Sequence, residues 1–205
     1  MLKDTGERVI PENMKITNGL LMEHVARYHF AAEYVSGRVL DFASGSGYGA
    51  HIIAKSCKHK VSEVVGVDRD KDAVTYARGT YYHPLTTFLE GDVTDPALPG
   101  ELGKFDFILS FETIEHIAEE EMFLSNIYQM LKPGGTLILS TPFGEGRGKP
   151  CGQTFHVHQL KVEEFHELFD SYKETEFFVQ KGVLIQPASV TEERDYPLGI
   201  AVCRK

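Results

Sequence analysis

The stretch "VLDFASGSGYGA", residues 39–50, is an apolar run that reaches an aspartate and continues into glycines. The residues that follow, "YGAHIIAKSCK" (48–58), have the apolar spacing of a helix. A buried strand, a tight glycine turn and a helix in this order predict the first unit of a doubly wound α/β sheet. Ligands of such sheets bind beyond the carboxyl ends of the strands, so polar residues at those ends are candidate site residues.

The alternation continues along the chain. Further strands are predicted at 63–68, 85–92, 104–111, 136–141, 173–180 and 198–204. Amphipathic helices are predicted at 18–35 and from Glu115 to Leu131, and a long loop at 142–154. The predicted fold is therefore α/β, a doubly wound Rossmann-like sheet of about seven strands, mostly parallel, with an antiparallel C-terminal edge hairpin.

Length and composition predict one domain. The 205 residues, 42% of them hydrophobic, are enough for one full core, and no linker or low-complexity block interrupts them. We expect a single domain over 1–205, with a helical cap at 1–35 and the cofactor-binding and catalytic core at 36–205.

Net charge limits the class of partner. A formal charge of −9 leaves no basic face for nucleic acid or an anionic membrane, so we expect a small-molecule substrate. Three widely separated cysteines indicate a reducing compartment, and no apolar segment has the length of a signal core or membrane span. We expect a cytoplasmic monomer or homodimer.

Two cofactor classes fit the glycine turn. Gly45, Gly47 and Ala50 match the dinucleotide pattern G-x-G-x-x-G/A, and Asp68 follows at the distance of a ribose-binding acid. Asp41, however, places a carboxylate where a pyrophosphate requires N–H donors. S-adenosylmethionine has no phosphate and carries an ammonium group and a sulfonium, so a carboxylate at this position favours it.

The third predicted strand ends in "LEGDVTD" (89–95), where Asp92 can accept from an adenine amino group and the Val93 N–H can donate to the ring. Together with "FDFILSFETIEH" and "LKPGGTLILSTP", the ordered series from about residue 36 to 142 resembles the class I S-adenosylmethionine-dependent methyltransferases. The segment before it resembles a bacterial subgroup that modifies sugars and other small molecules.

The resemblance implies a set of cofactor contacts. Beside Asp68 with its neighbour Arg69 on the ribose and Asp92 with Val93 on the adenine, the residues around the methionine part would be Asp41, Ala43, Gly45, Ser46, Gly47 and Ser110. Ala43 and Ser44 depart from the glycine or cysteine common there. Arg27 and Tyr28 would close over the methionine carboxylate. The alternative for these two is a core Tyr28 and a solvated Arg27.

Methyl transfer to a hydroxyl requires a base, and three histidines lie where the acceptor is expected. His116 follows the fourth strand, and His156 and His158 follow the long loop. We expect His156 or His158 to be the base, because "FHVHQL" sends both imidazoles to one side if it is extended. The other six histidines are expected at the surface.

A metal site is the alternative to this histidine base. If "ETIEH" is helical, Glu112, Glu115 and His116 share one face and could hold a divalent ion, as in some related methyltransferases that act on vicinal hydroxyls. The ordinary preference for acids at a helix N-terminus is the favoured explanation of the pattern, so no metal is expected. Two other functions stay open: an NAD-dependent oxidoreductase, and a non-catalytic accessory subunit that binds S-adenosylmethionine.

Overall fold

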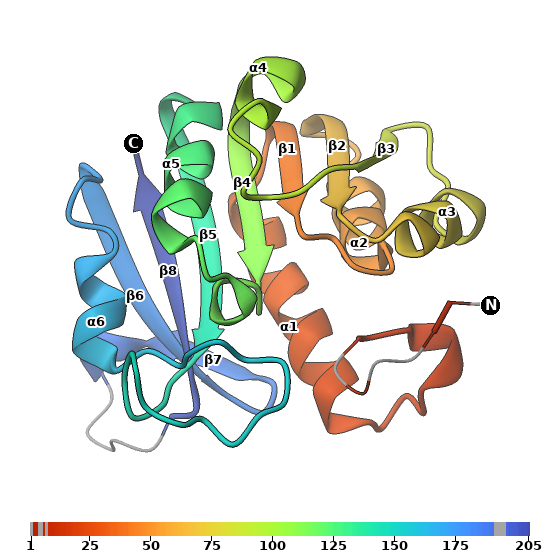
Figure 1. The fold of residues 1–205 in the computed structure, drawn as a ribbon. Coiled ribbons are helices and arrows are strands. Elements are labelled where there is room, and N and C mark those ends of the chain that lie inside the picture. The colour runs from red at the N-terminus through yellow and green to blue at the C-terminus, as the bar shows by residue number, and fades with distance from the viewer. Residues whose placement is uncertain (1, 4–5, 7, 191–195) are drawn as a thin grey trace.

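The computed structural model describes residues 2–3, 6, 8–190 and 196–205 (Figure 1). One eight-stranded sheet runs through it in the order β3-β2-β1-β4-β5-β8-β6-β7. Its strands are β1 (Gly37–Phe42), β2 (Val61–Asp68), β3 (Thr86–Glu90), β4 (Phe105–Phe111), β5 (Leu131–Pro142), β6 (Glu174–Lys181), β7 (Leu184–Pro187) and β8 (Leu198–Arg204). The helices are α1 (Gly19–Tyr34), α2 (Tyr48–Ser56), α3 (Lys71–Thr80), α4 (Leu98–Leu102), α5 (Glu120–Met130) and α6 (Val162–Glu167), with short 3₁₀ turns η1 (Pro11–Asn13), η2 (Ile114–His116) and η3 (Ala188–Val190).

The first five strands are parallel to one another. β1 lies between β2 and β4, and β3 and β5 extend the sheet on either side. Helices or short helical segments connect these strands, as parallel pairing requires. The predicted doubly wound architecture is confirmed, and the carboxyl ends of β1 and β4, where the chain turns to opposite halves of the sheet, meet at its centre.

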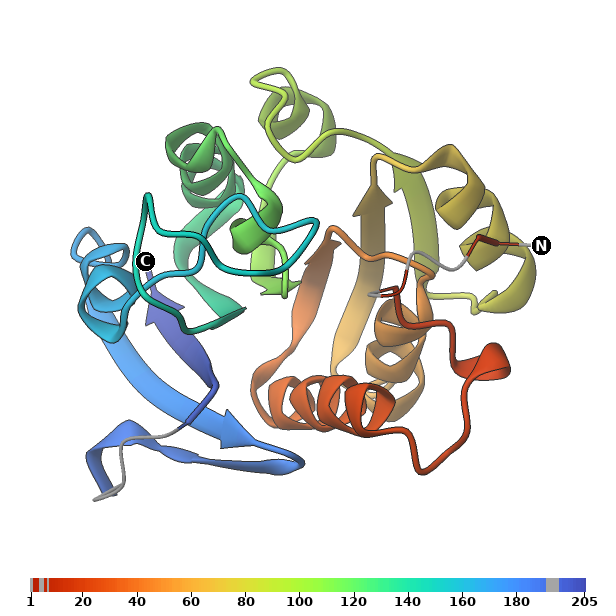
Figure 2. The same cartoon turned by 60° about the horizontal axis from the view of Figure 1, so that its bottom comes forward.

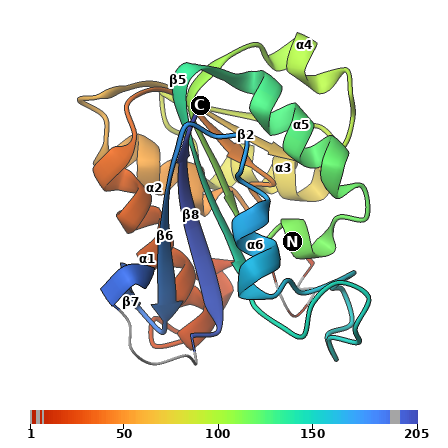
Figure 3. The ribbon, with the colours of Figure 1, turned by 90° about the vertical axis from the view of Figure 1, so that its left-hand side faces the viewer.

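Alternate residues of each strand enter two different cores. Val39 and Leu109 pack in one apolar cluster with residues of α1, α2 and α3, whereas Leu40 and Ile108 pack in a second with residues of α4, α5 and α6. Figure 3 shows α1 and α2 on one side of β6 and β8, and α5 and α6 on the other. The near-continuous apolar strands of the sequence reflect burial on both faces.

The C-terminal strands are antiparallel, as predicted, but arranged differently. β8 lies between β5 and β6 and is antiparallel to both. The edge of the sheet is a further strand, β7, which pairs with β6 and brings the count to eight. None of its four residues is buried, and the strand is too short to give a strand pattern in the sequence.

The helix expected from Glu115 is shorter than predicted. α5 begins at Glu120, and residues 114–116 form the separate 3₁₀ turn η2. Glu112 has a left-handed backbone (φ 50°), and the carbonyl of Glu115 accepts from the Val157 N–H at 2.8 Å instead of from the next helical turn. The loop before α6 therefore takes the hydrogen bond that would have continued a helix.

Helix α1 begins where the sequence predicts. Its N-cap is Asn18, whose side chain accepts from the Leu21 N–H.

Figure 2 brings toward the viewer the edge of the sheet at which β1 and β4 end. The N-terminal segment and the loop between β5 and α6 both lie on this edge. Among the described residues, no helix combines the length and the apolar character needed to cross a membrane.

Candidate active site

The turn between β1 and α2 has a left-handed backbone at three residues: Ala43 (φ 69°), Gly45 (55°) and Gly47 (88°). A Cβ at Gly47 would lie 2.5 Å from the Cβ of Ala77, so the turn packs tightly on α3. A Cβ at Gly45 would meet no heavy atom within 4 Å, so the turn is open on that side. Ala43 keeps a conformation that costs a non-glycine residue about 1–2 kcal/mol.

Asp68, at the end of β2, is bonded to this turn. Its Oδ2 accepts from the Gly45 N–H at 2.7 Å and its Oδ1 from the Asp70 N–H at 2.9 Å. Burial raises the pKa of Asp68. The N-cap of α3 is Asp70, which accepts from two N–H groups of the first turn and pairs with Arg8 at 2.7 Å. Since Asp70 caps the helix, Asp68 retains acceptor capacity for a ligand at the strand end.

Asp92 and Val93 follow β3. Asp92 Oδ1 accepts from the backbone and the hydroxyl of Thr94, and these bonds lower the pKa of Asp92. The positive charge of Arg69 lowers the pKa of Asp92 further. Val93 is buried, and its carbonyl accepts from Asn126 at 3.0 Å. An ionised carboxylate therefore lies at the end of β3, one strand away from Asp68.

Asp41 is enclosed beneath the turn. Its side chain is 1% exposed and accepts from the Tyr28 hydroxyl at 3.0 Å and from the Ala50 backbone. Burial raises the pKa of Asp41 to about 7. A Cβ at Gly49 would lie 1.9 Å from the Tyr28 ring, so the ring packs directly on α2. Tyr28 is a core residue that holds α1 against the glycine turn.

Arg27 is also buried, at 1% exposure, so the alternative of a solvated Arg27 is wrong. Its Nη1 donates to Gln180 Oε1 at 2.8 Å. The amide of Gln180 in turn donates to the carbonyls of Glu23 and Gly182. This pair joins α1 to β6, and Gln180 supplies one acceptor for the buried guanidinium, whose Nε has no hydrogen-bond partner among the described residues.

Two serines of the predicted cofactor set donate to backbone carbonyls. Ser46 Oγ donates to Val9 at 2.7 Å and so holds the N-terminal segment on the glycine turn. Ser110 Oγ donates to Phe42 at 3.0 Å and joins the ends of β4 and β1. Both side chains are buried. Both hydroxyl hydrogens are therefore engaged by backbone carbonyls.

Two acidic residues follow β4. Glu115 is 1% exposed; its Oε2 accepts from Thr141 at 3.0 Å, and its Oε1 has no hydrogen-bond partner among the described residues. Glu112 accepts from Ser140 at 3.2 Å. Burial raises the pKa of both carboxyls, and the charge of Glu112 raises that of Glu115 further. Ser140 and Thr141 lie near the carboxyl end of β5. As polar residues at a strand end, they could have been identified from the sequence as candidate site residues.

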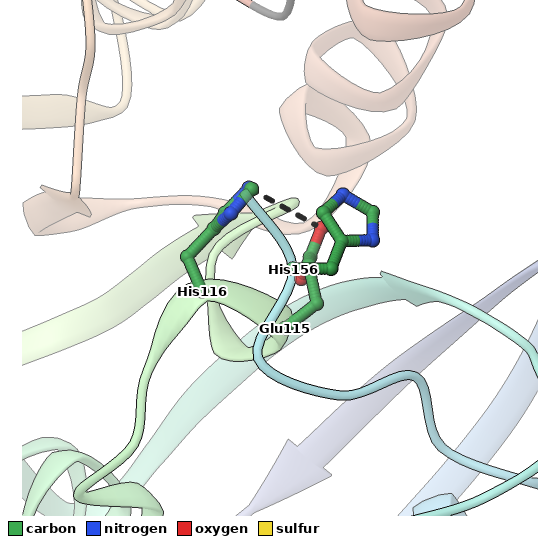
Figure 4. A group of neighbouring side chains, drawn as sticks. All are labelled: Glu115, His116 and His156. Carbon is green, nitrogen blue, oxygen red and sulfur yellow. Dashed lines mark ion pairs between the residues drawn. The ribbon is translucent and has the colours of Figure 1, made fainter. Parts of the chain in front are cut away.

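The structure brings His116 and His156 to Glu115 (Figure 4). The three ligand-type atoms lie within 4.8 Å of one another, and the two imidazoles meet edge to face with ring centres 4.9 Å apart. His116 Nε2 is 4.0 Å from Glu115 Oε1. Residues that the sequence placed in two competing hypotheses, a loop histidine and an acidic cluster, thus form one group.

His158 lies elsewhere. The segment 155–158 is not an extended strand, so the two loop imidazoles do not share one side. His158 Nε2 is 3.3 Å from Glu120 Oε2, and burial lowers the pKa of His158. Arg147 binds the same carboxylate at 2.6 Å and anchors the loop to α5. His24, expected at the surface, is half-buried against the Tyr48 hydroxyl at 3.0 Å.

Comparison with known proteins agrees with this geometry. A family described as a methyltransferase domain matches residues 40–139. The chain is 33% identical over 172 residues to the probable S-adenosylmethionine-dependent methyltransferase of Mycolicibacterium smegmatis, covering 82% of this chain and 63% of that protein. It is 32% identical over 122 residues to a ubiquinone biosynthesis O-methyltransferase of a Chelativorans species, covering 58% of this chain and 46% of that protein. The chain therefore spans less than two thirds of the length of either relative.

Among solved structures, one similar chain comes from the Haloferax volcanii complex of the Trm112 methyltransferase activator with a methyltransferase. The TM-score is 0.68 at 20% identity, with 91% of each chain covered. At this identity the likeness concerns the fold alone.

Proposed function

The chain belongs to the class I S-adenosylmethionine-dependent methyltransferases, and we propose that it transfers a methyl group from S-adenosylmethionine to a hydroxyl group of a sugar or another small metabolite. One observation carries this proposal: the Asp68 and Gly45 pair and the group of Glu115, His116 and His156 lie on the same edge of the sheet. Between these two sets of residues, the hydrogen bond from Ser110 to the Phe42 carbonyl joins the ends of β4 and β1.

The described residues fit the cofactor that the family implies. The glycine turn is open at Gly45, and the Asp68 carboxylate beside it keeps acceptor positions for two hydroxyl groups of a ribose. Asp92, after the end of the neighbouring strand β3, supplies a second acceptor, which we assign to the adenine amino group. Because Asp41 is enclosed and bonded to Tyr28, we assign it to positioning the turn, with cofactor contacts left to the turn itself.

S-adenosylmethionine, when bound, supplies a methyl carbon on a sulfonium that leaves as a neutral thioether. The acceptor oxygen forms its bond to that carbon as the carbon–sulfur bond breaks. The chain aligns the two and promotes loss of the hydroxyl proton, a role that we assign to the group of Glu115, His116 and His156. A neutral amine attacks without prior deprotonation, so a group of residues that promotes loss of a proton favours a hydroxyl acceptor.

The acceptor is proposed to be small. The net charge of −9 disfavours a nucleic acid as the acceptor. The loop between β5 and α6 lies on the edge of the sheet that carries Glu115, His116 and His156, and so limits the size of an acceptor there. The Chelativorans relative, by its name, methylates oxygen, which supports the same class of acceptor.

The test measures S-adenosylhomocysteine formed with a panel of hydroxyl and amine metabolites, after calorimetry with S-adenosylmethionine and with NAD. We expect binding of S-adenosylmethionine without competition from NAD, and turnover with hydroxyl acceptors. Binding of NAD alone would favour the oxidoreductase, and turnover with amines only would overturn the hydroxyl assignment. Tight cofactor binding without turnover across the panel would favour the accessory subunit.

A further inference from the structure

We propose that Glu115, His116 and His156 bind one divalent transition-metal ion at the acceptor side of the site. The sequence predicts no metal here, and the alternative metal site that it offers consists of Glu112, Glu115 and His116. The ligand set proposed now contains His156 instead of Glu112. Binding of the ion stands on geometry alone, whereas its role in methyl transfer rests on the function proposed above.

His116 is oriented as a ligand. Its Nδ1 lies 2.9 Å from the carbonyl oxygen of Phe155, a contact that requires the proton on Nδ1. The lone pair is then on Nε2, which is the nitrogen that faces Glu115 Oε1 at 4.0 Å. Histidines that bind metals commonly donate their second ring N–H to a backbone carbonyl, and the bond fixes both tautomer and ring direction.

Glu115 is oriented in the same way. Thr141 donates to Oε2 and leaves Oε1, which is buried and without a hydrogen-bond partner among the described residues, directed at His116. A buried carboxylate oxygen in this state is costly unless a cation or donor reaches it. The three ligand-type atoms, within 4.8 Å of one another, need to close to about 3.3 Å around an ion with bonds near 2.1 Å.

His156 is held in place through its two neighbours in the chain. The carbonyl of Phe155 accepts from His116, and the N–H of Val157 donates to the carbonyl of Glu115 at 2.8 Å. The loop is therefore fastened on both sides of His156 to the two other ligands. These two hydrogen bonds fix the backbone on both sides of His156 and so keep this residue close to Glu115 and His116.

The ligand set selects the kind of ion. Two imidazoles and one carboxylate suit Zn²⁺ and its first-row neighbours, whereas Mg²⁺ and Ca²⁺ prefer all-oxygen sites. Three protein ligands leave at least one position open for an oxygen of the acceptor. An acceptor hydroxyl bound there is acidified and releases its proton to solvent water, so that no imidazole is needed as the base.

The experiment uses the full chain, stripped with a chelator, and titrates it with Co²⁺ and Zn²⁺ while absorption spectra and binding heats are recorded. We expect one equivalent of Co²⁺ to give the visible bands of a protein-bound ion, and Zn²⁺ to displace it. His156→Ala should weaken Zn²⁺ binding at least ~100-fold. Glu115→Gln should do the same, with circular dichroism as the check on folding.

His158→Ala is the matched control, because it removes an imidazole from the same loop that contacts Glu120 instead of the group. Its affinity for Zn²⁺ should equal that of the unmodified chain. Absence of Co²⁺ bands, or equal weakening by the two histidine substitutions, would overturn the site. Calorimetry with S-adenosylmethionine on the stripped chain is independent of the ion, so failure of the cofactor to bind would count against the proposed function and not against the metal site.

Discussion

The Tyr28 hydroxyl lies 3.0 Å from Asp41 Oδ1 and joins helix α1 to the end of β1. Burial raises the pKa of this carboxyl from its ordinary value near 3.8 to about 7. Between these two pH values the folded chain binds a proton that the unfolded chain releases. The contribution of Asp41 to the free energy of unfolding therefore falls as pH rises from about 4 to about 7.

Asp41→Asn should remove this dependence. Relative to the unmodified chain, the variant should gain stability between pH 5 and pH 7.5 by at most about 3 kcal/mol, about 1.4 kcal/mol for each pH unit up to pH 7. Urea unfolding at both pH values measures the difference. A variant whose stability follows pH as the unmodified chain does would show that Asp41 is ionised throughout.

Two helical glycines should respond to alanine with opposite signs. Gly49 of α2 faces the Tyr28 ring, where a Cβ would be 1.9 Å from the nearest ring atom, so Gly49→Ala should destabilise the fold by ~3 kcal/mol or more. Gly79 of α3 has no heavy atom within 4 Å of such a Cβ, so Gly79→Ala should stabilise it by about 0.5–1 kcal/mol. Thermal unfolding compares them. Similar effects of the two changes would mean that α1 does not pack on α2 as described.

Asp68→Asn should weaken binding of S-adenosylmethionine by about 2–4 kcal/mol, because charge-assisted hydrogen bonds to the ribose are lost. Asp70→Asn is the control: it changes the neighbouring cap of α3 and should leave affinity within a few-fold. Calorimetry on both folded variants measures the difference. Equal affinities for the two variants would reject the ribose assignment of Asp68.

Of the loop histidines, only His156 should matter for turnover. His156→Ala should lower it about 10²–10⁴-fold with the affinity for S-adenosylmethionine unchanged. His158→Ala should cost less than ~10-fold, since this imidazole pairs with Glu120. Steady-state rates at saturating cofactor give the comparison, and a reversed order would place the acceptor nearer α5.

The strand ends of the site were predictable because burial on both faces gives each central strand a continuous apolar run that stops at a polar residue. Asp68 was located in this way. Asp92 was located from the acidic run after β3, an edge strand that buries only Phe88. The meeting of His156 with Glu115 was not, since no local pattern links residues 41 positions apart in a loop without periodicity. The same holds for the burial of Arg27, whose hydrogen-bond acceptor Gln180 lies 153 residues further along the chain. The sequence around Arg27 shows only a polar side chain on a helix.

The position of β8 between β5 and β6 sets the order in which the sheet can be completed during synthesis. The hairpin of β6 and β7 leaves the ribosome first, yet it has no strand to join until β8 has been made. Until then the outer edge of β5, with Leu137, Ile138 and Leu139 along it, has no partner strand. An unpaired apolar edge pairs readily with other chains. The nascent chain is therefore most prone to aggregation after β5 emerges, and this exposure ends when β8 inserts between its two neighbours.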